Sequence, residues 1–310
     1  MNYSVVIPVY KSASSLQEIV EQFKGLQQKH DVKFEIIFIN DSPFHEETCN
    51  TLSSLSSSND FVKVITLRKN QGQHLAIIVG LSYAKGDYVI TMDDDLQHPV
   101  CEIPNLIDAM SENPNLDAVF AIPPFERRKH HIWRNFGSFL IAKLDNFFLK
   151  KPKGLVKSSF RIFKKSIAES IVSNYNAMPS VSSLIIFYTH SIKNIRVEHH
   201  KRVYGKSNYT LRKLVSLTLN NYINFSSLPL KIMGFIGFVA FFVTIVFVVF
   251  TVIRKMFFGL SYPGYTSIIA LTGLLGSLNL LTLGFIGEYL IRIIKGIQKP
   301  GIRDMVSSES

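Results

Sequence analysis

Two long uncharged segments near the C-terminal end constrain the fold more than any other feature. Residues 232–253 and 267–287 contain no acidic or basic side chain. A helix of about 20 apolar residues is long enough to cross the hydrocarbon core of a bilayer. Buried helices of a large soluble protein are the alternative. Two such segments in succession, after an ordinary α/β pattern, favour a transmembrane hairpin over residues 229–290.

Positive charges predict the orientation of this hairpin. They lie on both outer flanks, with Lys206, Arg212, Lys213 and Lys231 before it and Arg292, Lys295, Lys299 and Arg303 after it. The connecting turn has only Arg254 and Lys255. Because cytosolic flanks carry the excess of Lys and Arg, we expect both ends in the cytosol. This gives a domain at 1–209, an amphipathic interfacial helix at 210–228 and a cytosolic tail at 291–310.

Charge and cysteine content narrow the range of partners. The net charge is +11, but no nucleic-acid-binding motif accompanies it. Beside a membrane hairpin, anionic lipid or phosphate is the simpler partner. Cys49 and Cys101 are the only cysteines and lack metal-type spacing, so we expect reduced thiols. The first residues run into a strand pattern without signal-peptide features, which predicts that the domain stays in the cytosol.

The N-terminal part alternates short apolar segments with amphipathic ones. Strands are predicted at 4–9, 34–39, 62–67 and 87–92, and helices at 16–28 and 73–84. The serine-rich stretch 53–58 is predicted to be a loop. Strands that alternate with helices predict a mostly parallel, doubly wound α/β sheet.

Polar residues follow each of the four strands. They occur at positions 8–10, 40–41, 68–70 and 93–95. In doubly wound sheets, ligands bind beyond the carboxyl ends of the strands. The four strand ends therefore predict one binding site at that edge of the sheet.

An acidic cluster ends the fourth strand. In an extended segment Asp93 and Asp95 point to the same side, whereas Asp94 points away. Two hard oxygen ligands so placed suit Mg²⁺ or Mn²⁺, which typically also bind substrate phosphates. A solvated acidic turn is the alternative, but the position of the pair after a buried strand favours a metal site.

Basic side chains are predicted to form the second part of the site. They are Arg127, Arg128, Arg134, Arg161, Lys164, Arg202 and Lys206. Arginine pairs with phosphate oxygens in a bidentate manner. Lys164 and one of the two adjacent arginines are expected to face water instead. The histidines show no zinc-ligand spacing and are left out of the site, although His98 lies next to the acidic cluster.

Taken together, these motifs resemble one family. VIPVY, FIND, DDDLQHP, SSFRIF and RVYGKSNY, with the two C-terminal segments, are similar to the polyisoprenyl-phosphate glycosyltransferases. These are family-two enzymes with a GT-A fold, a group that includes dolichyl-phosphate mannose synthase and the bactoprenol glucosyltransferases. The resemblance covers nearly the whole chain, and DDDLQHP with SFR and RVYGKS is its most specific part.

The resemblance implies a role for each matching residue. The implied metal ligands are Asp93, Asp95 and Gln97, and they would bind the diphosphate of a nucleotide sugar through Mg²⁺ or Mn²⁺. The implied donor-binding residues are Pro8, Tyr10, Asp41, Asp93, Asp94, Arg134 and Ser138. The implied acceptor-phosphate residues are Arg161, Arg202 and Lys206. The implied catalytic residues are Asp95, Arg161, Arg202 and Ser159.

The sequence departs from the family pattern at several positions. Asn40 begins a stretch, NDSP, where the family often has Asp-Asp-Gly-Ser, and Pro123 and Pro124 stand where Gly-x-Arg is usual. Ser159 occupies a position where bactoprenol-type members often carry an aspartate, proposed as a base. A phosphomonoester is largely dianionic at neutral pH, because its second pKa is near 6. A phosphate acceptor can therefore react without that base.

The resulting hypothesis is an inverting transfer of one sugar from a nucleotide to undecaprenyl phosphate in the bacterial inner membrane, for a surface glycan such as O-antigen. The resemblance also implies a homotetramer. A family-two transferase that extends a glycan on a hydroxyl acceptor is an alternative and would need a general base. A membrane-anchored, non-catalytic binding protein is the second alternative.

Overall fold

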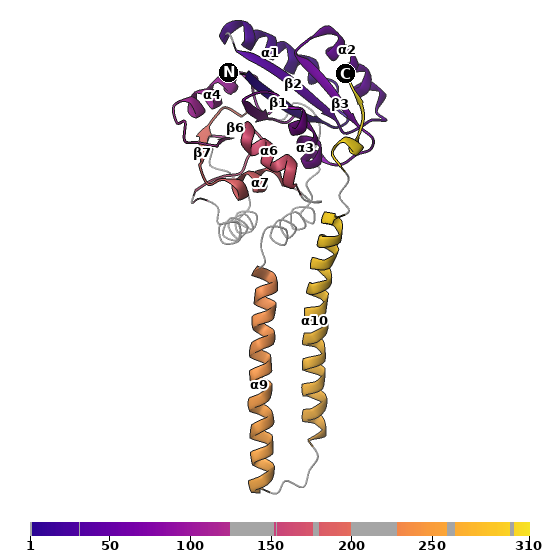
Figure 1. The fold of residues 1–310 in the computed structure, drawn as a ribbon, viewed down its shortest axis with the longest axis vertical. Helices are drawn as coiled ribbons and strands as arrows, with labels where there is room; N and C mark the ends of the chain where they lie inside the picture. The colour runs from indigo at the N-terminus through magenta and orange to yellow at the C-terminus, as the bar shows by residue number, and fades with distance from the viewer. Residues whose placement is uncertain are drawn as a thin grey trace. The chain divides into compact units, whose positions relative to one another are not determined.

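The computed structural model describes residues 2–30, 32–124, 152, 154–175, 180–199, 228–258, 264–297 and 301–310. The chain forms two compact units (Figure 1). The first contains residues 1–222 together with 299–310, and the second contains residues 223–298. The end of the predicted tail therefore belongs to the first unit and is not a separate segment.

The first unit is built on an eight-stranded sheet with the order β7-β5-β6-β4-β1-β2-β3-β8. Its strands are β1 (Asn2–Val9), β2 (Lys33–Asn40), β3 (Val62–Leu67), β4 (Tyr88–Thr91), β5 (Ala118–Ile122), β6 (Arg161–Lys164), β7 (Ile192–Arg196) and β8 (Val306–Glu309). The central strands β1 to β4 are parallel, as are β5 and β7. Strands β6 and β8 run antiparallel to their neighbours. The predicted, mostly parallel α/β sheet is confirmed.

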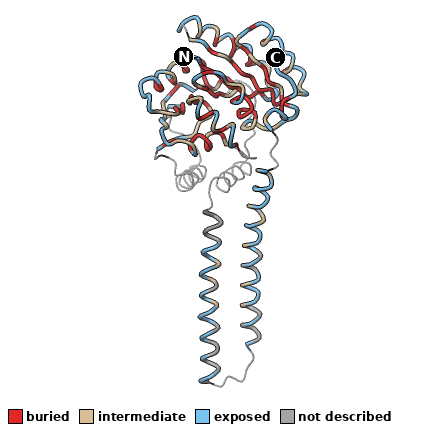
Figure 2. The backbone as a smooth tube through the Cα atoms, viewed as in Figure 1, coloured by how far each residue is buried: buried red, intermediate tan, exposed pale blue. Residues whose placement is uncertain are grey.

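Helices cover both faces of the sheet (Figure 1). They are α1 (Leu16–His30), α2 (Glu46–Ser58), α3 (Gln73–Tyr83), α4 (Ile103–Ser111), α6 (Lys165–Asn174) and α7 (Val181–Tyr188). In β1, Val5 and Ile7 join the core that contains α1 and α4 residues. Val6 points to the other face and lies against Gly80 of α3. Both faces of β1 are buried, which explains its continuous apolar sequence, and the buried positions concentrate in the sheet (Figure 2).

The serine-rich stretch 53–58 is helical, so the prediction of a loop is wrong. It forms the second half of α2. Leu52 and Leu55 are buried on one face of this helix, and their i, i+3 spacing is enough to hold it against the core. His45 caps the N-terminus, where its Nδ1 accepts a hydrogen bond from the backbone N–H of Thr48.

The second unit consists of two long helices, α9 (Leu228–Phe258) and α10 (Tyr265–Ile297). Among the described residues, one segment, Leu271–Ile291, is long and apolar enough to cross a membrane. The corresponding apolar stretch of α9, Gly234–Phe247, is shorter. Many large apolar residues of both helices are exposed, and parts of both helices are pale blue in Figure 2.

The half-buried carboxylate of Glu35 joins the amino ends of several strands. Glu35 Oε1 accepts hydrogen bonds from Ser4 Oγ and from the backbone N–H of Lys85, and its Oε2 pairs with Lys63 Nζ at 3.0 Å. Burial favours the neutral acid, but these bonds outweigh it and lower the pKa of Glu35. The folded protein therefore holds the charged form more strongly than the unfolded chain does.

The Glu35 cluster predicts a loss of stability in acid. Because the folded pKa of Glu35 is depressed, its contribution is complete above the unfolded pKa and disappears as the pH falls through the folded one. We expect the parent to lose about 1–2 kcal/mol more than Glu35→Gln between pH 5.5 and pH 3. Urea unfolding at several pH values measures this difference. Equal pH profiles for the two proteins would contradict the prediction.

Candidate active site

The candidate site lies at the carboxyl edge of the parallel strands. Tyr10 follows β1, Asp41 follows β2, Arg68 follows β3, and Asp93 comes two residues after β4. Side chains at this edge of parallel strands are the usual ligand-binding groups of such sheets. The structure thus brings the four predicted strand ends to one edge.

Asp93 is held by protein donors on both carboxylate oxygens. Its Oδ1 accepts from Gln73 Nε2 at 2.6 Å, and its Oδ2 accepts from Ser159 Oγ at 2.7 Å. His98 Nε2 lies 3.7 Å from Oδ2. Burial acts to raise the pKa of Asp93, but these donors and the charge of Arg161 lower it. Asp93 is therefore a fixed, ionised carboxylate.

Asp94 points into different surroundings. Ser15 Oγ donates to its backbone carbonyl oxygen at 2.5 Å, which ties it to the loop after β1. Its Oδ2 is buried and has no hydrogen-bond partner among the described residues. Burial, together with the charges of Asp93 and Asp95, raises the pKa of Asp94 to about 7. The three adjacent carboxylates thus have distinct environments.

The strand-alternation argument for Asp93 and Asp95 does not apply, because β4 ends at Thr91. Past that point the chain bends, and Leu96 has a φ of 58°. This conformation is unusual for a non-glycine residue. Asp95 is 8% exposed, and its Oδ1 accepts the backbone N–H of Gln97 at 3.2 Å. The bend, and not the pleat of a strand, determines where the predicted metal ligands point.

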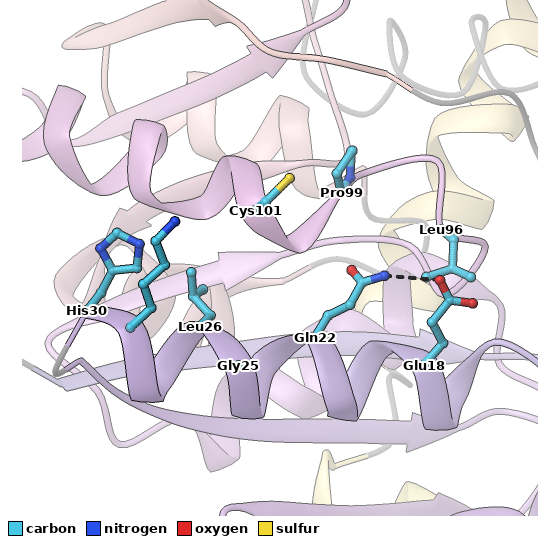
Figure 3. A pocket seen from close by; sticks show the side chains of 9 residues that line it. Glu18, Gln22, Gly25, Leu26, His30, Leu96, Pro99 and Cys101 are labelled. Atoms are coloured by element: carbon cyan, nitrogen blue, oxygen red, sulfur yellow. Dashed lines mark hydrogen bonds between the residues drawn. The ribbon is translucent and has the colours of Figure 1, made fainter.

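A cavity of about 420 Å³ lies behind this bend, between α1 and the segment after the acidic cluster (Figure 3). Leu96, Pro99 and Cys101 line one side, and Leu26 and Gln22 of α1 line the other. The Leu96 side chain is buried, with 6% exposure. Burial of this side chain helps to hold the unusual backbone of the bend.

Ser159 is a hydrogen-bond donor to Asp93 and not an isolated hydroxyl. Its Oγ also lies 3.3 Å from His98 Nε2, and its carbonyl oxygen accepts from Thr91 Oγ1 at 2.8 Å. His98 stacks on Phe160, with ring centroids 5.0 Å apart. Ser159 and His98 therefore orient Asp93. His98 was left out of the predicted site, and only its sequence position beside the cluster pointed to it.

Arg161 is almost completely buried in β6, with 1% exposure. Its Nε donates to Thr91 Oγ1 at 2.9 Å, and its Nη1 donates to Ser158 O at 3.0 Å and to Ser182 Oγ. Burial lowers the pKa of Arg161 to about 10, so it is charged at neutral pH. In this structure the guanidinium joins strands and acts on Asp93 through its charge. Its contact with a phosphate stays a prediction.

Asp41 fixes the loop between β3 and α3. Its Oδ1 accepts from the backbone N–H of Gln71 at 2.6 Å, and its Oδ2 accepts from that of Gly72 at 2.9 Å. Asn70 Nδ2 donates to the same carboxylate at 3.1 Å. Burial raises the pKa of Asp41, although the bonds from Gln71 and Gly72 act in the opposite direction. Asp41 thus shapes the predicted donor pocket through this loop.

The remaining predicted residues differ in their exposure to solvent. Tyr10 is half exposed after β1, whereas Pro8 is buried within that strand and presents little surface to a ligand. Asn40 is buried, and its Nδ2 donates to Cys49 Sγ at 3.3 Å, a hydrogen bond that an ionised aspartate could not donate. The predicted residues outside the described part of the chain are Arg127, Arg128, Arg134, Ser138, Arg202 and Lys206.

The donor set at the acidic cluster fits a hard divalent cation. Asp93 and Asp95 are two positions apart and would supply carboxylate oxygens, and Gln97 would supply an amide oxygen. Among the described residues, no group of three or more His, Cys, Asp or Glu side chains is arranged to bind a metal alone. Mg²⁺ commonly binds through one or two carboxylates and completes its shell with water and substrate phosphates.

The fold of the first unit is GT-A-like, with an acidic cluster at the carboxyl edge of a mostly parallel sheet. A family model described as glycosyl transferase family 2 matches residues 4–172. The chain belongs to this family. One solved structure, mannosyl-3-phosphoglycerate synthase from Rubrobacter xylanophilus, is similar with a TM-score of 0.50 and 17% identity, over 70% of each chain.

Curated relatives match over a longer range. An undecaprenyl-phosphate 4-deoxy-4-formamido-L-arabinose transferase of Pseudomonas paraeruginosa is 26% identical over 95% of this chain and 86% of its own length. The protein of the same name from Pseudomonas savastanoi pv. phaseolicola is 27% identical over 95% of this chain and 87% of its own. The similarity thus extends well beyond the region that the family model covers.

Proposed function

We propose that this protein transfers one sugar from a nucleotide-sugar donor to a polyprenyl phosphate, with inversion at the anomeric carbon. The observation that carries the proposal is the extent of the match. Relatives named as undecaprenyl-phosphate transferases align over 95% of the chain, whereas the family model ends at residue 172. The additional region includes the apolar helices, which are what an enzyme with a lipid acceptor needs.

The acidic cluster would hold the donor. Asp93 and Asp95, with Gln97, would bind Mg²⁺ or Mn²⁺, and the bound ion would neutralise the diphosphate as it leaves. Gln73 and Ser159 hold Asp93 in one orientation. Arg161 adds positive potential beneath the site without needing to touch the substrate. These residues keep the Asp93 carboxylate ionised and in place.

The acceptor chemistry accounts for the serine at position 159. A lipid phosphate is already an oxygen nucleophile at neutral pH. Ser159 Oγ donates a hydrogen bond to Asp93 at 2.7 Å, so this hydroxyl keeps its proton and does not act as a general base. A hydroxyl acceptor would require a general base instead. This geometry favours the phosphate acceptor over the glycan-extending alternative.

Ser159→Ala tests this role. We expect about tenfold weaker affinity for Mn²⁺, because a support of one ligand carboxylate is lost. The transfer rate at saturating Mn²⁺ should stay within a few-fold of the parent. Titration of Mn²⁺ by electron paramagnetic resonance, beside an activity titration, separates the two effects. A large rate loss that added metal cannot restore would contradict the prediction and point to a role of Ser159 in the chemical step.

We further propose that α9 and α10 form a hairpin through the bacterial inner membrane, with both termini in the cytosol. Strand β8 pairs with β3 in the same sheet as β1. The chain before α9 and the chain after α10 therefore lie on the same side of a membrane. A single crossing by α10 would place them on opposite sides, so it requires a second crossing by α9. In a Cys49→Ser, Cys101→Ser background, a cysteine at Ser261 should react with a membrane-impermeant thiol reagent from the outside of the cell. Protection there, with labelling only after lysis, would contradict the hairpin.

A panel of donors tests the activity. Membranes that contain the protein are incubated with labelled nucleotide sugars and undecaprenyl phosphate, with and without a chelator. We expect one donor to give a lipid-linked sugar in a metal-dependent reaction. Extension of a glycan acceptor, with no lipid product from any donor, would support the alternative activity and overturn the proposal. Size measurement of the purified protein tests the homotetramer that the family resemblance implies.

A further inference from the structure

The residues after α10 return to the sheet and are here called the C-terminal clasp, residues 301–310. Its strand β8 runs antiparallel to β3, and Figure 1 shows it in yellow beside that strand. Ser307 Oγ donates to the carbonyl oxygen of Thr66 at 3.0 Å. Met305 and Val306 are buried, with 2% and 8% exposure. The clasp is therefore anchored by side chains as well as by backbone pairing.

The clasp is hydrogen-bonded to Arg68, the first residue of the loop whose N–H groups bind the Asp41 carboxylate. The backbone N–H of Arg68 donates to the carbonyl oxygen of Met305 at 2.8 Å. Arg68 Nε donates to the carbonyl oxygen of Asp304 at 3.0 Å. The Asp304 carboxylate accepts the backbone N–H of Gly301 at 3.0 Å, which closes the turn that presents these carbonyls. Two hydrogen bonds thus join this turn to Arg68.

The same loop carries the donors that fix Asp41. The backbone N–H groups of Gln71 and Gly72 and the side-chain amide of Asn70 all bind the Asp41 carboxylate. Positions 68–70 are otherwise exposed. At the far end of α3, the helix that this loop begins, Tyr83 Oη donates to Glu309 Oε1. The clasp therefore contacts both ends of the segment that runs from the loop through α3.

We propose that the C-terminal clasp is a positioning element for the donor pocket: it holds residues 68–72 in the conformation that fixes Asp41. Without the clasp, Arg68 loses both partners and the outer edge of β3 is unpaired. An exposed loop with fewer hydrogen bonds opens more often. The link to donor binding rests on the proposed function, but the effect on the loop does not.

Hydrogen exchange in the full chain in detergent tests the effect on the loop. Val306→Asp places a charge in a buried position of β8 and should release the clasp, and Arg68→Ala removes one of its contacts. We expect amide exchange across residues 68–73 to accelerate about tenfold in Val306→Asp and several-fold in Arg68→Ala. Ser308→Ala, an exposed change in the same strand, is the matched control and should leave exchange unchanged. If Val306→Asp does not fold, Arg68→Ala decides the test.

Kinetics separate this inference from the proposed function. For an active donor, release of the clasp should raise the KM several-fold with a smaller effect on kcat, because ground-state binding is weakened. If no donor is active with the parent, the proposed function fails, and the exchange result alone still decides whether the clasp holds the loop. Exchange at 68–73 that stays at the parent rate, while β3 amides accelerate, would overturn the inference.

Discussion

Asp95→Ala is expected to lower the rate of sugar transfer about a thousandfold or more. Asp95 is a buried carboxylate at the bend after β4, and its neighbour Asp93 is already bound to Gln73 and Ser159. Removal of Asp95 takes away one of the two carboxylates proposed to hold the metal, and with it much of the stabilisation of the leaving diphosphate. Initial rates with the active donor, at several Mg²⁺ and Mn²⁺ concentrations, measure the loss.

Asp60→Ala is the matched control for this variant. Asp60 is exposed between α2 and β3, so the same chemical change there should leave the transfer rate within twofold. The melting temperature of Asp95→Ala should stay close to that of the parent, because loss of a buried charge beside two other carboxylates relieves repulsion. Transfer at more than a tenth of the parent rate would exclude Asp95 as a required metal ligand.

Gly86→Ala is expected to destabilise the first unit by about 3 kcal/mol or more. A Cβ at Gly86 would lie 2.6 Å from the backbone N of Ser4, with the carbonyl oxygen of Asn2 at 2.8 Å. These atoms belong to the backbone of the central strand β1, which cannot move without disturbing the sheet. The backbone N–H of Gly86 also donates to Ser4 Oγ at 2.7 Å. Thermal and urea unfolding of the detergent-solubilised protein measure the effect.

Gly25→Ala provides the opposite outcome with the same added methyl group. Gly25 lies in α1 with no atom within 4 Å of its added Cβ. Alanine favours the helix over glycine, so we expect a gain of about 0.5–1 kcal/mol. If both variants behave alike, close packing at Gly86 is not the cause of the loss.

The parallel core of the fold could be predicted because its signal is local. Continuous apolar runs such as residues 36–39 and amphipathic helices such as α1 follow from residue spacing alone. The clasp could not be predicted in the same way. VSSE has no strand pattern of its own, and β8 exists because β3 leaves an unpaired edge for it. The loop prediction for the serine-rich half of α2 failed for a related reason. Burial of two leucines outweighs the low helix propensity of serine.

The candidate site was predictable in its residue types but not in its contacts. Asp93, Asp95 and Asp41 were recognised from their position after strands. The donors that orient Asp93, Gln73 and Ser159, lie far from it in the sequence, and no spacing rule links them to it. Arg161 carried the right chemistry for phosphate, but burial is a property of the packed sheet and could not be read from its motif.

Strand β8 also determines when the sheet can be completed during synthesis. Ser307 contacts Thr66 across a separation of 241 residues. At about 5–20 residues per second, the ribosome needs roughly 12–50 s to extend the chain between them. Throughout that interval the edge of β3 is unpaired, and both apolar helices are made in its last part. Open strand edges are sites of aggregation. The edge of β3 is therefore open to pairing with other chains until β8 has been made.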